Sequence, residues 1–233
     1  MITNDTDKVD ADRFEQEVRF RNIERLIHFT HTDNLISIFE WGAIYSRKKL
    51  EELSIEHPQL YMHDYVEVND GLRLDNLQGY INLSIQYPNS FLLKRFRDRL
   101  SSSLGGWCLL EISPDLIFRN DALFSIGNAA SRSSKNQGIS GTFEKFKSLF
   151  SEEVLSGGVN NYRTINRAGL AQNSTTDEQA EVLLLSSIPI EKINRIIFED
   201  NEQLQISKGA ISLMSSKIPP CHVEPLAFKG RGR

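Results

Sequence analysis

Apolar and polar residues alternate along this chain in short runs that predict strands followed by helices. Residues 25–30 (RLIHFT) form the first strand-like run. Apolar residues between 35 and 39 then recur at helical spacing, with Thr32 or Asp33 as the N-cap and Gly42 as the C-terminal stop. The pattern predicts a strand-turn-helix unit with a His-x-Thr sequence at its hinge.

A second unit of the same kind is expected further along. Residues 77–85 (LQGYINLSI) are strand-like, Pro88 suits a helix start, and apolar residues within 91–100 recur at helical spacing. Three more buried strands are predicted at residues 107–112, 181–186 and 193–198. The strands and helices lack the regular βαβ period of a doubly wound sheet, so we expect an α+β fold.

Two long segments, residues 128–141 and 156–176, are polar and rich in Gly and Ser. They predict loops, and loops of that length in a compact domain are often functional. No internal repeat or low-complexity run interrupts the chain.

Length and charge constrain the organisation further. The 233 residues, 39% of them hydrophobic, are enough for one sizeable core. Of the net charge of −4, residues 1–20 contribute most, with six acidic and three basic side chains. We therefore expect an acidic N-terminal extension (1–20) before a single domain (21–233). Nucleic acid would have to be bound by a local basic patch, because the chain as a whole is acidic.

Membrane and metal sites are not predicted. No run of about 18 apolar residues occurs, and the N-terminus is polar and acidic, which favours a soluble, cytoplasmic protein without membrane contact. Cys108 and Cys221 form neither a disulfide framework nor a clustered zinc site. We expect Cys108 to be a small buried hydrophobic residue.

The segment Gln179-Ala180-Glu181 is the strongest candidate for chemistry. Alternate residues of a strand share a face, so Gln179 and Glu181 would point the same way at the start of the predicted strand. A carboxylate beside the ribose of NAD can bind its hydroxyl and stabilise the positive charge that develops as the glycosidic bond breaks. Alone, the tripeptide is also compatible with a solvated strand edge.

Three other residues could join that site. His28 and Thr30 alternate along the first strand, so both could bind a ribose or a carboxamide, whereas His31 faces the other way. Arg73 lies in an acidic loop, where its guanidinium could bind a pyrophosphate or only form surface ion pairs. A lone histidine at a strand end is also common as a purely structural residue.

These motifs occur in an order that resembles the DarT family of DNA ADP-ribosyltransferases. The similarity begins at residues 26–35 and continues at Arg73 with Asp75, at 84–89 (SIQYPN), at 128–130 (NAA) and at 176–183 (TDEQAEVL). It spans roughly residues 25–200, and its opening also resembles the His-Gly-Thr start of the poly-ADP-ribose polymerases. The resemblance implies an ADP-ribosyltransferase domain with a central, split, mixed β-sheet flanked by helices, and NAD as co-substrate.

The resemblance also implies roles for individual residues. Glu181 matches the catalytic glutamate and Arg73 a catalytic, NAD-binding arginine. On the NAD side it assigns His28, Thr30, Asn34 and Tyr87, with Phe91, one helical turn after Tyr87, as the candidate to stack on nicotinamide. Gln179 would contact the acceptor. The chain departs from the thymine-modifying members at residues 82–86, where their Tyr-Phe-x-Pro-Arg run is replaced, and Arg73 lies closer to the next strand.

The acceptor implied by the resemblance is a base of single-stranded DNA. A paired base hides its ring nitrogens, so the enzyme would act on single-stranded or extruded nucleotides. The 84–89 and 128–130 signatures are similar to the guanine-modifying branch, which favours guanine over thymine. Basic residues that could contact the DNA are Arg163 and Arg167 in the loop before Glu181, and Arg95 and Arg132 elsewhere.

Members of this family are commonly toxins paired with an antitoxin whose hydrolase domain removes ADP-ribose, so the resemblance implies such a partner. Other functions remain open from the residues alone. The chain could transfer ADP-ribose to protein or RNA, could bind NAD or nucleic acid without catalysis, or could serve only in protein interactions.

Overall fold

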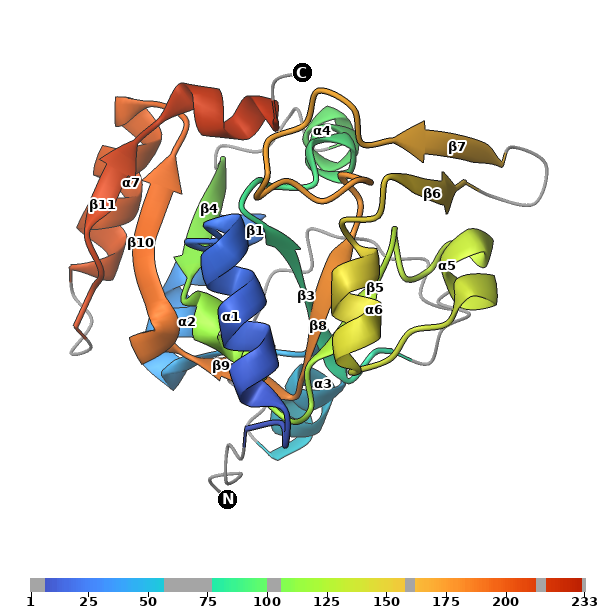
Figure 1. Cartoon of the computed structure of the whole chain (residues 1–233). Coiled ribbons are helices and arrows are strands. Elements are labelled where there is room, and N and C mark those ends of the chain that lie inside the picture. Colours follow the sequence, from blue (N-terminus) through green and yellow to red (C-terminus); the bar gives the residue numbers. More distant parts are fainter. Residues whose placement is uncertain (1–6, 57–76, 100–105, 158–161, 213–216, 232–233) are drawn as a thin grey trace.

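The fold is built on a mixed β-sheet whose seven strands come from both halves of the sequence (Figure 1). The computed structural model describes residues 7–56, 77–99, 106–157, 162–212 and 217–231. In spatial order the strands are β11 (Cys221–Val223), β10 (Ile193–Phe198), β4 (Trp107–Ile112), β1 (Leu26–His31), β3 (Tyr80–Ile85), β8 (Glu181–Leu185) and β5 (Leu123–Ser125). Only β10 and β11 run parallel; the other neighbours in this sheet are antiparallel.

Helices flank this sheet, as the α+β expectation requires. The described residues contain the α-helices α1 (Ala11–Arg21), α2 (Asn34–Trp41), α3 (Arg47–Glu56), α4 (Ser90–Arg99), α5 (Arg132–Gln137), α6 (Phe143–Ser148) and α7 (Asn201–Ile211). Short 3-10 helices are η2 (Pro114–Phe118), η3 (Ile190–Lys192) and η4 (Pro225–Lys229). Two small antiparallel pairs complete the fold: β2 (Ala43–Tyr45) with β9 (Ser187–Pro189), and β6 (Glu153–Ser156) with β7 (Arg163–Asn166). The prediction of a mixed central sheet flanked by helices is confirmed.

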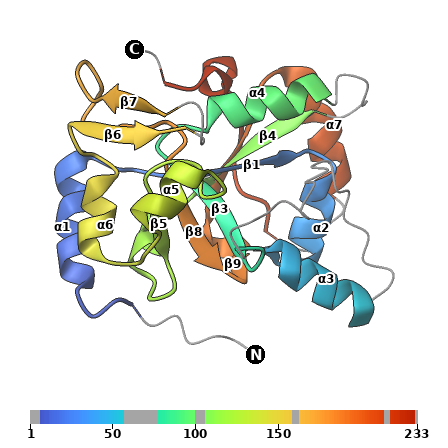
Figure 2. The same ribbon diagram turned by 90° about the vertical axis from the view of Figure 1, so that its right-hand side faces the viewer.

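Alternating side chains give the sheet an apolar layer on each face. Leu26 of β1 belongs to the larger cluster, which includes core residues of α1, α2 and α6. Its neighbour Ile27 belongs to a smaller cluster with Leu93 of α4 and Phe228 of η4. Since strand residues point alternately to opposite faces, the two clusters cover opposite sides of β1. Figure 2 shows α4 crossing one end of the molecule, with α1 and α6 side by side at its edge.

The sheet is weakly joined at its centre. β1 pairs with β4 over six residues, but with β3 only through Leu26 opposite Ile85 and Ile27 opposite Ser84. Beyond Ile27 the two strands no longer form register pairs. The sheet therefore divides between β1 and β3, which agrees with the predicted split, and the divergence begins at His28.

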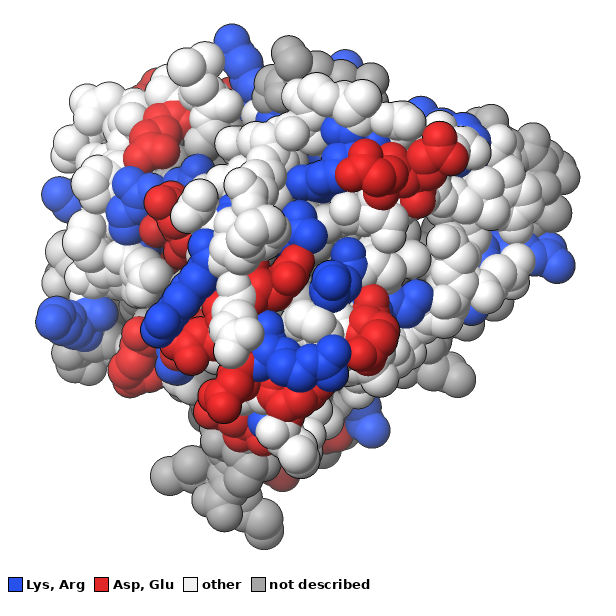
Figure 3. Space-filling view, viewed as in Figure 1, with Lys and Arg blue, Asp and Glu red and all other residues white. Residues whose placement is uncertain are grey.

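The N-terminal segment is part of the packed structure from α1 onward. Phe14 of α1 is fully buried and its ring lies 5.5 Å from that of Phe146 on α6. Acidic and basic side chains intermingle over this face of the molecule (Figure 3), and Glu17 pairs with Arg21 at 2.7 Å along the helix. The boundary that we expected after residue 20 therefore falls within α1, and residues 11–21 pack with the domain rather than extend from it.

The five strands predicted from sequence are all present, and the errors concern their ends and the segments between them. The strand predicted at 107–112 matches β4 and that at 193–198 matches β10. The two predicted loops were wrong in part, because they contain helix α5 and strand β7. Helix α4 starts after Pro88, since the side chain of Asn89 accepts a hydrogen bond from the Leu92 N–H, as an N-cap does.

Candidate active site

Glu181 is a buried carboxylate at the first position of β8. Its side chain belongs to a residue only 4% exposed, whereas Val182, the next residue, is fully buried in the main core. Alternation along the strand therefore directs Glu181 away from that core. Its Oε2 accepts a hydrogen bond of 2.9 Å from the backbone N–H of Ala129. Buried carboxylates are costly unless hydrogen-bonded, so such a group at a strand end indicates a functional position.

The loop that follows β5 supplies this hydrogen bond. Ser125, the last residue of β5, lies opposite Glu181 in the sheet, and its hydroxyl donates to the Gly127 carbonyl at 2.7 Å. A turn then runs from Asn128 to Ser131, closed by the Ser131 N–H donating to the Asn128 carbonyl at 2.9 Å. The N–H of the second turn residue is not used in closing such a turn. That residue is Ala129, which leaves its N–H to Glu181.

Gln179 does not lie on the strand, which corrects our expectation. β8 begins at Glu181, and Gln179 belongs to the turn that precedes it. This turn is held by Asp177, whose Oδ1 accepts from the Gln179 N–H at 2.9 Å and whose carbonyl accepts from the Ala180 N–H at 3.1 Å. The position of Gln179 relative to Glu181 thus follows from an Asp-based turn and not from strand alternation.

His28 lies on β1, where that strand leaves β3. Its Nδ1 is 3.1 Å from the carbonyl oxygen of Asn82 on β3. Burial lowers the pKa of His28 from its ordinary 6.5, and the Asn82 carbonyl raises it by less, so the ring is neutral at pH 7. Since a carbonyl can only accept, Nδ1 carries the proton and Nε2 is left as an acceptor.

Thr30 and Asn34 form a second polar pair near the end of β1. Thr30 lies two residues after His28 and so on the same side of the strand. Asn34, the first residue of α2, donates from Nδ2 to Thr30 Oγ1 at 3.1 Å. Its Oδ1 is buried and has no hydrogen-bond partner among the described residues. An unsatisfied buried acceptor beside two hydrogen-bonding side chains is a position where a bound ligand can supply the missing donor.

Strand β3 connects the two halves of the site. His28 contacts β3 at Asn82, and Asn82 lies opposite Leu183 on β8, two residues from Glu181. In the order of the sheet, β3 therefore lies between β1, which carries His28, and β8, which carries Glu181. Arg73 lies outside the described residues, so its predicted role stays a prediction.

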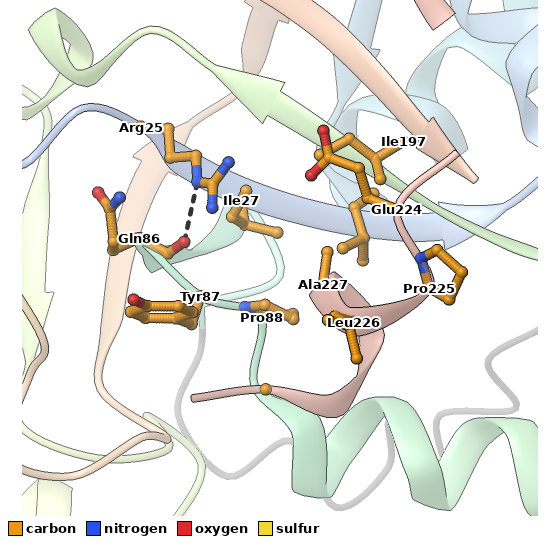
Figure 4. A pocket seen from close by; sticks show the side chains of 12 residues that line it. Arg25, Ile27, Gln86, Tyr87, Pro88, Ile197, Glu224, Pro225, Leu226 and Ala227 are labelled. Carbon is orange, nitrogen blue, oxygen red and sulfur yellow. Dashed lines mark hydrogen bonds between the residues drawn. The ribbon is translucent and has the colours of Figure 1, made fainter. Parts of the chain in front are cut away.

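Tyr87 and Phe91 are the two aromatic residues predicted to contact NAD. Tyr87 lines a cavity of about 510 Å³ with Arg25 and Glu224, over the face of the sheet formed by Ile27 (Figure 4). That face is opposite to the side of β1 that carries His28 and Thr30. Phe91 on α4 is 59% exposed, whereas Leu93 of the same helix is buried.

The predicted DNA-contacting arginines fall into two groups. Arg95 on α4, Arg132 on α5 and Arg163 on β7 have exposed side chains. Arg167 instead donates to the backbone carbonyls of Ala171, Gln172 and Ser174. Its guanidinium therefore shapes the loop before β8, because most of its donors are used within the protein.

Several residues that build the site were not predicted from the sequence. Asn82, Ser125, Asp177 and Ala129 all act through backbone groups or a turn, and none carries a motif that names such a role. The signature at residues 128–130 predicts the acceptor base, whereas in the structure the Ala129 N–H donates to Glu181.

The described residues contain no group of three or more His, Cys, Asp or Glu side chains able to hold a metal ion. Nor does any helix in the described ranges combine the length and apolar character needed to cross a membrane. Cys108 is fully buried, as expected.

Comparisons with known proteins identify the family. The family model described as "ssDNA thymidine ADP-ribosyltransferase, DarT" matches residues 27–229. The match and the split mixed sheet define the chain as a member of the ADP-ribosyltransferase class. Within that class, the chain belongs to the DarT family, because the family model covers well over half of its length. No curated protein sequence matches the chain at a significant level.

Solved structures share the fold. DarT of Thermus sp. 2.9 in complex with ADP-ribosylated ssDNA has a TM-score of 0.60 at 12% identity, covering 88% of this chain and 96% of that one. The same protein with NAD+ has a TM-score of 0.57 at 12% identity and the same coverage. DarTG of Thermosipho africanus in complex with ADP-ribose has a TM-score of 0.58 at 21% identity, covering 90% of this chain and 52% of that one.

Proposed function

We propose that this protein transfers ADP-ribose from NAD to a base of single-stranded DNA, with Glu181 as its catalytic carboxylate. The observation that carries the proposal is the burial of Glu181 at the start of β8, hydrogen-bonded to Ala129 and one strand away from the His28 contact. Membership of the DarT family and the complexes of Thermus sp. 2.9 DarT with NAD+ and with ADP-ribosylated ssDNA support it.

The β1 residues would bind the substrate NAD. The Nε2 of His28 can accept a hydrogen bond from a ribose hydroxyl, because the Asn82 carbonyl occupies Nδ1. The unsatisfied Oδ1 of Asn34 can accept a hydrogen bond from a carboxamide N–H. Arg73 would compensate the charge of the phosphates, as the resemblance implies.

The reaction joins a base nitrogen to the anomeric carbon of the nicotinamide ribose. The bond from that carbon to nicotinamide breaks, and nicotinamide leaves with the electron pair, which makes it neutral. Positive charge develops on the ribose in between, and the Glu181 carboxylate stabilises it electrostatically. The proton released by the base passes to Glu181 or to solvent, which balances the transfer.

Exposed basic side chains would hold the DNA strand. Arg95, Arg132 and Arg163 are exposed on three different elements. Such residues can track the phosphates of a single strand, while Gln179, in the turn just before Glu181, is close in sequence to where the base must arrive. Arg167 would act indirectly, by fixing the loop that contains this turn.

We further propose guanine as the acceptor base and toxicity as the consequence. The support for guanine is the similarity of residues 84–89 and 128–130 to the guanine-modifying branch, although the matching family model is described for thymidine. The support for a paired antitoxin is the fold shared with the DarTG of Thermosipho africanus, of whose chain the match covers 52%.

Product identification on defined oligonucleotides tests these proposals. The protein is incubated with biotin-labelled NAD and single-stranded oligonucleotides that differ in one base, and products are located by mass spectrometry. We expect a mass increase of one ADP-ribose on oligonucleotides containing guanine, and a roughly 10²- to 10³-fold slower appearance of this product with the Glu181→Gln variant. Labelling only of thymine would overturn the guanine proposal, and labelling of protein or RNA but of no DNA would overturn the DNA proposal.

A further inference from the structure

The turn at Asn128–Ser131 has a function that its sequence does not reveal, and this inference rests on the proposed role of Glu181. We infer that the backbone amide of Ala129 is a positioning group for the catalytic carboxylate. It donates to Glu181 Oε2 at 2.9 Å, and Ala129 is only 1% exposed. A backbone N–H aimed at a carboxylate favours its charged form and limits its rotation.

Neighbouring contacts hold that amide in place. The Ser125 hydroxyl binds the Gly127 carbonyl just before the turn. The Ser131 hydroxyl accepts from the Ser134 N–H at 3.2 Å just after it, which caps α5. The turn is therefore anchored on both sides, on β5 and on α5. Ser125 also lies opposite Glu181 in the sheet. The pairing of β5 with β8 therefore fixes the positions of both the loop that donates the hydrogen bond and the carboxylate that accepts it.

The segment before β8 packs against the same loop. A Cβ on Gly127 would lie 3.1 Å from Asp177 Oδ2 and 3.3 Å from Ser134 Oγ, which is tighter than most real contacts. Glycine at this position lets the loop approach the Asp177 turn closely. The Asp177 turn leads directly into Glu181. Close packing of this turn against Gly127 therefore helps to hold the Ala129 amide and the Glu181 carboxylate next to each other.

This arrangement gives the Asn128-Ala129-Ala130 signature a new meaning. Of the three residues, Ala129 provides the N–H to Glu181, whereas the Asn128 side chain accepts from the Ala130 N–H at 2.9 Å within the turn. The signature would therefore serve the catalytic carboxylate whatever base is modified. We therefore expect its Ala129 amide to affect the rate of the transfer.

The Ala129→Pro variant tests this inference, because proline removes the N–H and its fixed φ suits the second position of a turn. A second variant replaces Ala129 by lactic acid, which converts the amide to an ester and removes the N–H with little change in shape. Asn128→Ala is the matched control in the same turn. Turnover and the KM for NAD are measured with a single-stranded oligonucleotide, beside circular dichroism spectra as a check of folding.

We expect kcat to fall about 10- to 100-fold in both N–H-deleted variants, with the KM for NAD within about 3-fold of wild type. Asn128→Ala should keep kcat within about 3-fold, since it leaves the N–H in place. Adding Ala129→Pro to Glu181→Gln should cause no further loss, because the two groups act as one unit. The acidic limb of the pH–rate profile should also move to higher pH when the N–H is removed.

Full activity of the ester variant would overturn the inference, as would an equal loss in Asn128→Ala. These outcomes differ from failure of the proposed function itself. If the wild-type protein modifies no DNA, or if Glu181→Gln is fully active, the proposed function is wrong. If the wild type is active and Glu181→Gln is inactive, only the role of the Ala129 amide is in question.

Discussion

The two sides of the candidate site are constructed in different ways. On the β1 side, His28 and Thr30 belong to a regular strand that pairs with β4 over six residues. On the β8 side, Glu181 is the first residue of its strand and depends on a turn more than 50 residues away for its hydrogen bond. Strand pairing thus holds the backbone of the β1 side, whereas buried contacts between loops hold the Glu181 side chain on the β8 side.

The difference teaches how this fold divides binding and catalysis. The β1 side chains accept or donate hydrogen bonds as neutral groups, since burial lowers the pKa of His28. The β8 side holds a carboxylate, which interacts best with charge that develops during the reaction. We therefore expect the β1 side to contribute mainly to NAD binding and the β8 side mainly to the rate of the chemical step.

The largest effect should come from Glu181→Gln. The amide keeps the shape of the side chain and removes its charge, so kcat should fall roughly 10²- to 10³-fold while the KM for NAD stays within about 3-fold. Steady-state kinetics with a labelled oligonucleotide measures both values. Glu191→Gln, on the exposed surface of η3, is the control and should behave as wild type. A loss seen only in KM would contradict the division between the two sides.

A smaller effect should follow from His28→Ala, which removes the Nε2 acceptor. We expect the KM for NAD to rise and kcat/KM to fall about 10-fold, as for the loss of one buried hydrogen bond of about 1–2 kcal/mol. Titration of NAD binding by calorimetry should give the same ratio. His222→Ala on β11 is exposed and should leave binding unchanged. If His28→Ala lowers kcat alone, His28 belongs functionally with Glu181.

The smallest effect is expected from a decrease in pH, which should lower the free energy of unfolding and weaken NAD binding. The folded state keeps His28 neutral below the pH at which the unfolded chain takes up a proton, near 6.5. The unfolded state then binds more protons, so the free energy of unfolding should decrease as pH falls from about 6.5 through the lowered pKa of His28. NAD binding should weaken over the same range, because a protonated Nε2 can no longer accept a hydrogen bond. Chemical denaturation of wild type and His28→Gln between pH 7 and pH 5 measures the difference; equal slopes would contradict it.

Sequence by itself determined the parts of this protein that depend on local order. The strand-like run at residues 25–30 identified β1, side-chain alternation along it gave His28 and Thr30 a shared side, and the apolar run at 193–198 identified β10. The ordered motifs identified the DarT family and singled out Glu181. These features can be recognised in the sequence because side-chain alternation and short motifs are properties of neighbouring residues.

Tertiary structure alone decided the contacts that complete the site. The packing of Phe14 into the core made helix α1 part of the domain, although it belongs to the acidic N-terminal part of the sequence. Gln179 lies in the Asp177 turn and not on the strand. The turn after β3 places Tyr87 at the face of the sheet that carries Ile27. The Ala129 amide reaches Glu181 across 52 residues of sequence through a backbone group. No side-chain pattern encodes such a contact, since every residue except proline carries the same N–H and only the fold selects which one is used.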